Sequence, residues 1–321
     1  MAFDMDHLVE RRKLRRKLSV WRIVAVLALI ILVAAASLNF VVDEDSLSHK
    51  KSHIAKIVFS GTIIGQERKL KLIRQLEKND SVKGVIVSIN SPGGATSGGE
   101  AIYNALKQLG EKKPVVASMD ALAASAGYII ALPAERIFAR RTSITGSIGV
   151  LFQYTDLTGL MDTVGVKMRS IKSAPLKAEP NPFSGQNPEA EAMIAKMIDD
   201  SFQWFVDLVA ENRPFDRQRA LELADGRIVT GGQAVDLQLV DELGGPEEAK
   251  NWLIQNHNLD SNLQLIEWKP EPITESFPFG FASKIAASLL PQPIIDLFDQ
   301  RNTAVQLDGL VSVWQAQKNE Q

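Results

Sequence analysis

Residues 123–128 of this 321-residue chain read Ala-Ala-Ser-Ala-Gly-Tyr, and we expect the fold to be organised around them. They follow an apolar run, residues 114–119, whose length and composition predict a buried strand. Small residues beside Ser125 let a substrate backbone approach its hydroxyl, and a helix starting there points unpaired N–H groups at charge developing nearby. The stretch predicts an exposed nucleophile, although the commoner role of such a serine in α/β proteins is structural.

Strands and helices alternate before this stretch. Apolar runs and helical spacing predict a strand, a helix, a strand and a helix, in that order, over residues 57–59, 66–78, 84–90 and 99–109. Such alternation with short connections favours an α/β fold with a largely parallel sheet, whose functional loops gather at the carboxyl ends of the strands. We therefore expect the Ser-Pro-Gly-Gly turn at 91–94 to lie beside Ser125.

The two glycines of that turn allow two interpretations. They permit a tight turn because they lack a Cβ, and this alone explains many Gly-Gly pairs. In the functional interpretation, the bare backbone of Gly93 or Gly94 presents an N–H group to a substrate carbonyl, which with the N–H of Ala126 makes an oxyanion hole. The chain has no Gly-x-Gly-x-x-Gly pattern after a strand, which disfavours a dinucleotide site.

The base that would activate Ser125 is not a histidine of the core. The chain has four histidines, and none lies between residues 55 and 255 (His7, His49, His53 and His257). A serine nucleophile needs a base within hydrogen-bond reach, so a lysine or a carboxylate has to serve. Lysine can do so if burial lowers its pKa toward neutrality.

Two lysines have the apolar or small neighbours that such a base requires. Lys172 ends a predicted strand over 166–171, and Lys177 lies in the following loop between leucine and alanine. The residues alone do not choose between them, and in most sequences both would be solvated loop lysines.

Composition narrows the class of protein. The net charge of −2 gives no basic field for binding nucleic acid. The chain has no cysteine, which removes thiol nucleophiles, disulfides and thiolate metal sites, and we find no spacing of metal ligands and no cofactor motif.

The N-terminus predicts a membrane anchor. Six cations between residues 11 and 17 precede an uncharged apolar run over 23–42, just long enough to span a bilayer as a helix. The cations should stay cytoplasmic, which places the rest of the chain on the far side. A signal peptide cleaved near Ala34-Ala35-Ala36 is the alternative, and we favour the uncleaved anchor because apolar residues continue beyond it.

The second half reads as mostly helical. Apolar spacing predicts helices over residues 189–212, 216–223, 232–237 and 247–255. Asp241 and Glu242 are expected to cap a turn or to meet Arg227.

Several motifs together resemble the signal peptide peptidase A family, the short, single-repeat form of protease IV. The motifs, in family order and spacing, are Ile89-Asn90-Ser91-Pro92-Gly93-Gly94, residues 123–128, Thr145-Gly146-Ser147-Ile148-Gly149-Val150 and Ile171-Lys172-Ser173-Ala174-Pro175-Leu176-Lys177. The resemblance continues through Asp225-Gly226-Arg227 and residues 239–244, and covers roughly residues 55–265. Ala126 and Ile129-Ile130 depart from the commoner family residues without removing a functional group.

The resemblance implies a ClpP/crotonase-like α/β fold of repeated strand-strand-helix units and a Ser-Lys serine peptidase. By position in the motifs, Ser125 is the nucleophile, Lys177 the general base and Ser147 the residue that orients the lysine. Gly93 or Gly94 together with Ala126 would form the oxyanion hole. It also implies a homo-oligomer and substrates that are signal peptides and other apolar peptides.

These inferences give an expected organisation. A cytoplasmic segment (1–22), a transmembrane anchor (23–42) and a linker (43–54) precede a peptidase domain (55–268) and a C-terminal extension (269–321). We expect a single-pass protein of the bacterial inner membrane, bound to the lipid bilayer by its N-terminal helix, with the catalytic domain periplasmic. The alternatives are a non-proteolytic peptide-binding scaffold and, less favoured, an acyl-CoA hydrolase or hydratase of the same fold.

Overall fold

The computed structural model describes residues 17, 21–30, 51–270 and 311–313. The chain divides into two compact units, residues 1–51 and 52–321. In the first, residues 21–30 are helical. Within the described parts of the chain, no helix has both the length and the apolar character that crossing a bilayer needs. The predicted anchor over 23–42 continues past residue 30, so its second half lies outside the described residues.

An eight-stranded sheet forms the centre of the second unit. Its main path runs β7-β6-β4-β2-β1-β9, while β5 pairs with β4 and β8 pairs with β5. All these pairs are parallel except β6 with β7. The strands are β1 (His53–Ser60), β2 (Val82–Ser91), β4 (Val115–Ala124), β5 (Arg136–Ala139), β6 (Ile144–Gly146), β7 (Ile228–Thr230), β8 (Glu242–Leu243) and β9 (Gln264–Trp268).

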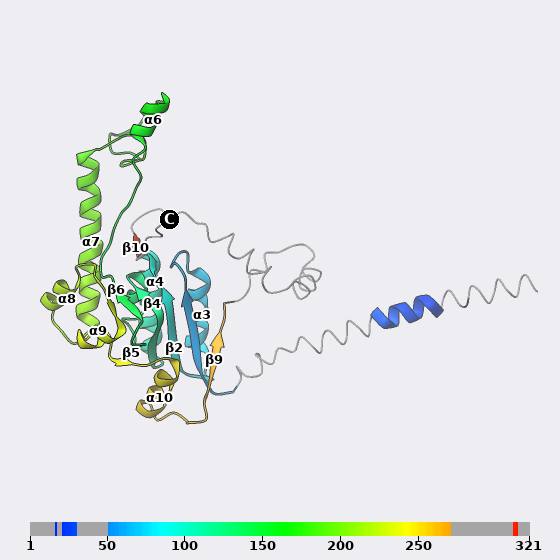
Figure 1. Ribbon diagram of the computed structural model, residues 1–321. Helices are drawn as coiled ribbons and strands as arrows, with labels where there is room; N and C mark the ends of the chain where they lie inside the picture. Colours follow the sequence, from blue (N-terminus) through cyan, green and yellow to red (C-terminus); the bar gives the residue numbers. More distant parts are fainter. Residues whose placement is uncertain (1–16, 18–20, 31–50, 271–310, 314–321) are drawn as a thin grey trace, which may run out of the picture. The chain divides into compact units, whose positions relative to one another are not determined.

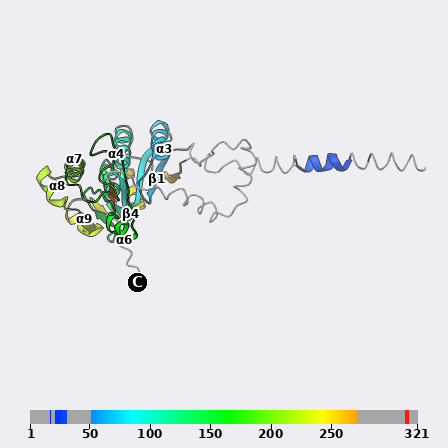
Figure 2. The ribbon, with the colours of Figure 1, turned by 90° about the horizontal axis from the view of Figure 1, so that it is seen from above.

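Both faces of this sheet are buried, which is why the strands are continuous apolar runs. In β2, Val85 and Val87 face one cluster of the core and Ile86 faces another, as the two-residue period of a strand requires. The first cluster is covered by α3 (Glu67–Lys78) and α4 (Thr96–Gly110), which Figure 2 shows side by side. The second cluster is covered by α10 (Pro246–Asn256) through Ala249 and Leu253. The predicted α/β fold is confirmed.

The segment 147–187 leaves the sheet as an arm, with α6 (Thr158–Val164) at its far end, and α7 (Pro188–Asn212) returns from it (Figure 1). The predicted strand over 166–171 is wrong: these residues are irregular and exposed. Val166 and Met168 alternate with polar residues as in a strand, but no neighbouring strand pairs with this segment in the described chain. The start of α7 is fixed by the Asn187 side chain, which accepts from the Ala190 N–H, and by Pro188 at the first turn.

Smaller helices close the domain beside α7. They are α8 (Arg217–Leu223) and α9 (Gly231–Asp236), close to the predicted ranges. Thr230 and Gln233 form a capping box at α9. At the other edge, His53, which the sequence placed in the linker, is instead the first residue of β1 and is buried, where it accepts a hydrogen bond at 2.9 Å from Trp268.

A second, two-stranded sheet lies at the carboxyl end of β2. It consists of β3 (Gly93–Ala95) and β10 (Val311–Val313), which run antiparallel. Apart from β10, the C-terminal extension from residue 271 onward lies outside the described residues, including its apolar segments at 277–281 and 285–290.

Candidate active site

Ser125 stands between the end of β4 and α5 (Ala126–Ile129), a single helical turn. Its backbone has φ 57° and ψ −118°, a conformation rarely adopted by residues other than glycine. The Ser125 N–H donates to Gly146 O at 2.9 Å, and the Ser125 carbonyl accepts from Tyr128 N at 2.8 Å. Such strain costs on the order of 1–3 kcal/mol and persists where the surroundings fix it, as here.

The turn at 91–94 lies directly beside Ser125, as predicted. Ser91 is in register with Ala123 of β4, and a Cβ added to Gly127 would lie 2.9 Å from Ser91 O. Ser125 is only 1% exposed, so the expectation of an exposed hydroxyl is wrong for the single chain.

The backbone groups of Gly93 and Gly94 differ in their hydrogen-bond partners and in the direction in which they point. The Gly93 N–H donates to Ser91 Oγ at 3.1 Å, and Gly93 O accepts from Ile63 N at 2.8 Å. The Ala95 N–H donates to Ile63 O at 2.9 Å. Since backbone groups alternate in direction along a strand, the N–H and C=O of Gly94 point to the opposite edge of β3. Of the two, Gly94 has the better placed N–H for an oxyanion.

Replacing Gly94 by alanine should destabilise the protein. The new Cβ would lie 2.2 Å from Ile63 O, so either β3 or the segment that carries Ile63 has to move. We expect the free energy of unfolding to fall by about 2 kcal/mol. Thermal unfolding measures this effect. Gly159→Ala in α6 is the control, since its Cβ would meet nothing within 4 Å; equal behaviour of the two variants would contradict the close packing at Gly94.

Ser147 follows β6, which pairs with β4 along Leu122–Ala124. It is half-buried, has φ 52°, and its N–H donates to Arg227 O at 2.7 Å. The pairing of β4 with β6 and the hydrogen bond from the Ser125 N–H to Gly146 O hold the residues around Ser125 and Ser147 together. The structure therefore brings the predicted serines and glycines to one end of the sheet.

The two candidate lysines lie on the arm. Lys172 is half-buried and forms an ion pair with Glu179, whose pKa the hydrogen bond from Lys172 holds below its usual value. Lys177 is exposed, and its N–H donates to Ala174 O at 3.1 Å. The single chain thus leaves the Lys177 side chain in solvent rather than packed against the buried Ser125.

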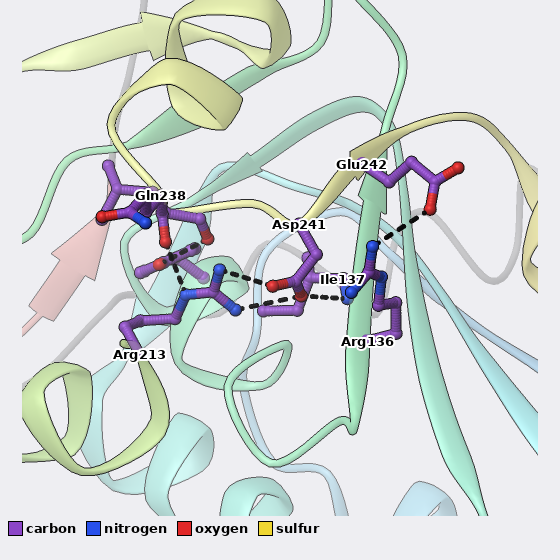
Figure 3. Close-up of polar contacts among 8 residues, drawn as sticks. Arg136, Ile137, Arg213, Gln238, Asp241 and Glu242 are labelled. Carbon is purple, nitrogen blue, oxygen red and sulfur yellow. Dashed lines mark hydrogen bonds and ion pairs between the residues drawn. The ribbon is translucent and has the colours of Figure 1, made fainter. Parts of the chain in front are cut away.

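A polar cluster that the sequence did not reveal joins the end of α7 to β5 and to the segment before β8 (Figure 3). Arg213 donates to both carboxylate oxygens of Asp241, at 2.8 and 3.1 Å, and to Gln238 O at 2.8 Å. Asp241 also accepts from the Ile137 N–H at 2.7 Å. The Tyr128 hydroxyl donates to Leu239 O at 2.8 Å.

This cluster corrects one expectation about the acidic residues. Asp241 pairs with Arg213 and Glu242 with Arg136, whereas Arg227 pairs with Asp225. Burial raises the pKa of Tyr128 above its usual value, so its hydroxyl stays neutral and acts as a donor. Twenty-eight positions separate Arg213 from Asp241, and no local pattern marks the pair.

Removing Arg213 should strongly destabilise the domain. Its side chain is 4% exposed, and Arg213→Ala leaves Asp241 without its cation in a mostly buried place. We expect a loss of about 3 kcal/mol in the free energy of unfolding, measured by denaturant titration. The control is Arg217→Ala, because Arg217 and Asp207 form an ion pair with both side chains half exposed and should contribute less than about 0.5 kcal/mol. Similar losses of unfolding free energy in both variants would show that the Arg213–Asp241 pair contributes no more to stability than a surface ion pair.

Comparisons with known proteins relate this chain to peptidases. The sequence profile of peptidase family S49 matches residues 107–260, and that of Clp protease matches residues 48–155. The chain is 38% identical over 235 residues to "Putative protease slr0021" of Synechocystis, covering 72% of this chain and 84% of that protein.

Two further relatives are longer than the region shared with this chain. One is "Putative signal peptide peptidase SppA" of Enterococcus faecium, 32% identical over 70% of this chain and 64% of that protein. The other is "Serine protease SPPA, chloroplastic" of Arabidopsis thaliana, 32% identical over 63% of this chain and 30% of that protein. With a relative 38% identical across 84% of its length and a match to the peptidase profile, the chain belongs to peptidase family S49 and is a serine peptidase.

Proposed function

We propose that this serine peptidase cleaves apolar peptides, including signal peptides left in the membrane, with a Ser125–Lys177 dyad. The observation that carries the proposal is Ser125 itself. Ser125 is held at φ 57° between the end of β4 and a helical turn. Beside it lies the glycine turn, in which the Gly94 N–H points away from Ile63. This arrangement supports a nucleophile beside an oxyanion hole.

The reaction would proceed through an acyl-enzyme. Neutral Lys177 takes the proton of the Ser125 hydroxyl as Oγ attacks the peptide carbonyl, and the oxyanion is held by the N–H groups of Gly94 and Ala126. The lysine then passes the proton to the leaving amine. Water, deprotonated by the same lysine, attacks the ester and releases the acid. Ser147 would orient the lysine.

The ion pair between Lys172 and Glu179 supports Lys177 over Lys172 as the base. A base has to be neutral to accept a proton, and a lysine paired with a carboxylate is stabilised in its charged form. Lys172 has such a partner in Glu179. Lys177 has the right position in the family motif, and the proposal requires burial of its side chain when it acts as the base.

A second subunit would supply that burial. We propose a homo-oligomer in which the arm of one subunit lies over the Ser125 site of the next. The arm carries large apolar side chains that are more than half exposed in the single chain, a pattern that marks an interface (Leu160, Val164, Val166, Met168 and Ile171). Exposed Lys177 lies on the same arm.

The position of the enzyme is also part of the proposal. The uncharged run over 23–42, with six cations before it, supports a single-pass anchor in the bacterial inner membrane with the peptidase domain outside the cytoplasm. The name of the Enterococcus relative, a signal peptide peptidase, supports substrates of that kind. An anchored peptidase works close to the membrane, where such peptides remain after cleavage.

Labelling with a serine-reactive fluorophosphonate probe tests the central assignment. The purified full chain should incorporate the probe and hydrolyse an uncharged fluorogenic peptide, and Ser125→Ala should do neither. Labelling that persists in Ser125→Ala would place the nucleophile elsewhere. A chain that binds the peptide but is neither labelled nor active would be the peptide-binding scaffold instead.

A further inference from the structure

A buried ion pair closes the part of the arm that carries Lys177. Its partners are Lys172 and Glu179, the first and last residues of a segment that we call the lysine loop (172–179). The Glu179 side chain is only 5% exposed and that of Lys172 22%, although residues 162–171 just before the loop are all exposed. Taking two charges out of water often costs as much as their attraction returns, so stability alone does not explain the pair.

Both oxygens of the Glu179 carboxylate have donors from within the arm. One accepts from Lys172 Nζ, and the other accepts from Ser184 Oγ at 2.5 Å. Residues 172–184 contain no helix or strand. The two ends of the lysine loop are therefore held together by side-chain contacts, with Glu179 at their centre.

Lys177 lies inside two overlapping turns of this loop. Its N–H donates to Ala174 O at 3.1 Å, and the Glu179 N–H donates to Leu176 O at 3.2 Å. Between them Ala178 has φ 60°, in the left-handed region that residues with a Cβ rarely adopt. Such a backbone persists only where its surroundings fix it, and the ion pair across the loop is a contact that does so.

We propose that Lys172 and Glu179 are positioning residues, which hold the lysine loop closed so that Lys177 reaches Ser125 in a fixed orientation. The inference rests on the proposed function, because it takes Lys177 as the base. Neither positioning residue touches the reacting atoms. Since their charges cancel, the pair fixes the loop without adding net charge beside the lysine.

Lys172→Arg separates pairing from proton transfer. Arginine keeps the positive charge and can pair with Glu179, but its guanidinium stays protonated and cannot serve as a base. We therefore expect Lys172→Arg to keep kcat for an uncharged fluorogenic peptide within about threefold of the wild type. Lys172→Met and Glu179→Gln each break the pair. Both should lower kcat by about 10-fold or more, with KM within about twofold, because the loop then holds Lys177 less well.

The pH dependence of kcat/KM reports whether the pair lies close to the base. In Lys172→Met, Glu179 keeps its negative charge without a cation, which favours the protonated base and moves the acidic limb to higher pH. In Glu179→Gln, the cation of Lys172 loses its carboxylate, and the limb moves to lower pH. We expect shifts of about 0.5 pH unit in opposite directions. Loosening of the loop alone acts alike in both variants and cannot produce opposite shifts. The other titratable groups that interact in this part of the arm are the same in both variants (Tyr154, Asp156 and Glu191).

Hydrogen exchange of the full chain gives a readout that does not depend on hydrolysis. The Lys177 and Glu179 amides are hydrogen-bonded within the loop. A peptide fragment that covers residues 173–183 should exchange at least about fivefold faster in Lys172→Met and Glu179→Gln than in Lys172→Arg. Equal exchange in all variants and the wild type would overturn closure of the loop by the pair.

Glu211→Gln is the matched control for loss of a carboxylate. Glu211 of α7 and Lys107 of α4 form an ion pair at 4.0 Å, and both side chains are more than half exposed. Removing this carboxylate should leave kcat, the acidic limb and exchange in the lysine loop unchanged. Effects equal to those of Glu179→Gln would overturn a specific role of the loop pair.

The outcomes separate this inference from the proposed function. Wild-type kcat in both Lys172→Met and Glu179→Gln, with Lys177→Met inactive, would overturn the positioning role and leave the Ser125–Lys177 mechanism standing. Shifts of the acidic limb in the same direction, or no shift, would overturn the placement of the pair beside the base. An inactive Lys172→Arg together with an active Lys177→Met would make Lys172 the base and overturn the proposed dyad as well.

Discussion

Ser125→Ala is expected to lower kcat by at least about 10⁴-fold while the protein remains folded. In the proposed mechanism, the reaction loses the atom that forms the acyl-enzyme, and what remains is substrate binding and the oxyanion hole. The substitution removes one oxygen from a buried side chain, so the melting temperature should change by only a few degrees. Peptide hydrolysis at saturating substrate and thermal unfolding of the same preparation measure the two quantities.

Ser118→Ala is the matched control for that experiment. Ser118 lies on the same strand, β4, and is fully buried, and its Oγ has no hydrogen-bond partner in the structure as described. Removing an unpaired buried hydroxyl should be neutral or slightly stabilising, and activity should stay near that of the wild type. If Ser118→Ala also lost activity, the effect of Ser125→Ala would report damage to β4 rather than loss of the nucleophile.

The central sheet was predictable from the sequence because burial on both faces makes its strands continuous apolar runs. The predicted strand before Ser125 stopped at residue 119, whereas β4 continues to Ala124. Asp120 interrupts the apolar run, yet it is accommodated in the strand because its carboxylate accepts from Ser88 Oγ at 2.8 Å. A polar residue with a partner on the next strand cannot be distinguished from the end of a strand by composition.

The sequence identified most residues of the candidate site but not the tertiary contacts between them. Apolar runs placed Ser125 and the glycine turn at strand ends, and the parallel sheet brings such ends together. Ser147 was identified only by its position in the family motif. The choice of Gly94 over Gly93 required the hydrogen bonds to Ile63 and Ser91, which lie on other segments. The Arg213–Asp241 pair was missed for the same reason, since a contact made only by tertiary packing leaves no local periodicity.

The failed strand prediction over 166–171 has a physical meaning. Val166 and Met168 alternate with polar residues, as in a strand with one buried face, whereas in the single chain both faces of this segment are exposed. In the homo-oligomer proposed above, a neighbouring subunit covers these side chains. Since Lys177 lies on the same arm, that subunit would also bury the lysine.

Lys177→Met is expected to lower kcat by at least about 10³-fold, because methionine keeps much of the length of the side chain and cannot accept a proton. Lys167→Met is the control, since Lys167 is an exposed lysine of the same arm and should be dispensable. Full activity of Lys177→Met would remove the lysine from the mechanism. Its loss of activity would leave one question, whether the lysine serves Ser125 of its own chain or of a neighbour.

Mixed oligomers answer that question. Ser125→Ala subunits keep the lysine and Lys177→Met subunits keep the serine, so neither is active alone. In a ring assembled at random from equal amounts, a site shared between neighbours has both intact groups in about one case in four. Co-expression of the two variants should therefore restore about a quarter of wild-type activity. A dyad completed within each chain restores none.

Co-expression of Ser125→Ala with a chain carrying both substitutions is the control, because it contains no intact serine and should stay inactive. Recovery above that control requires the arm of one subunit to lie over the Ser125 site of the next.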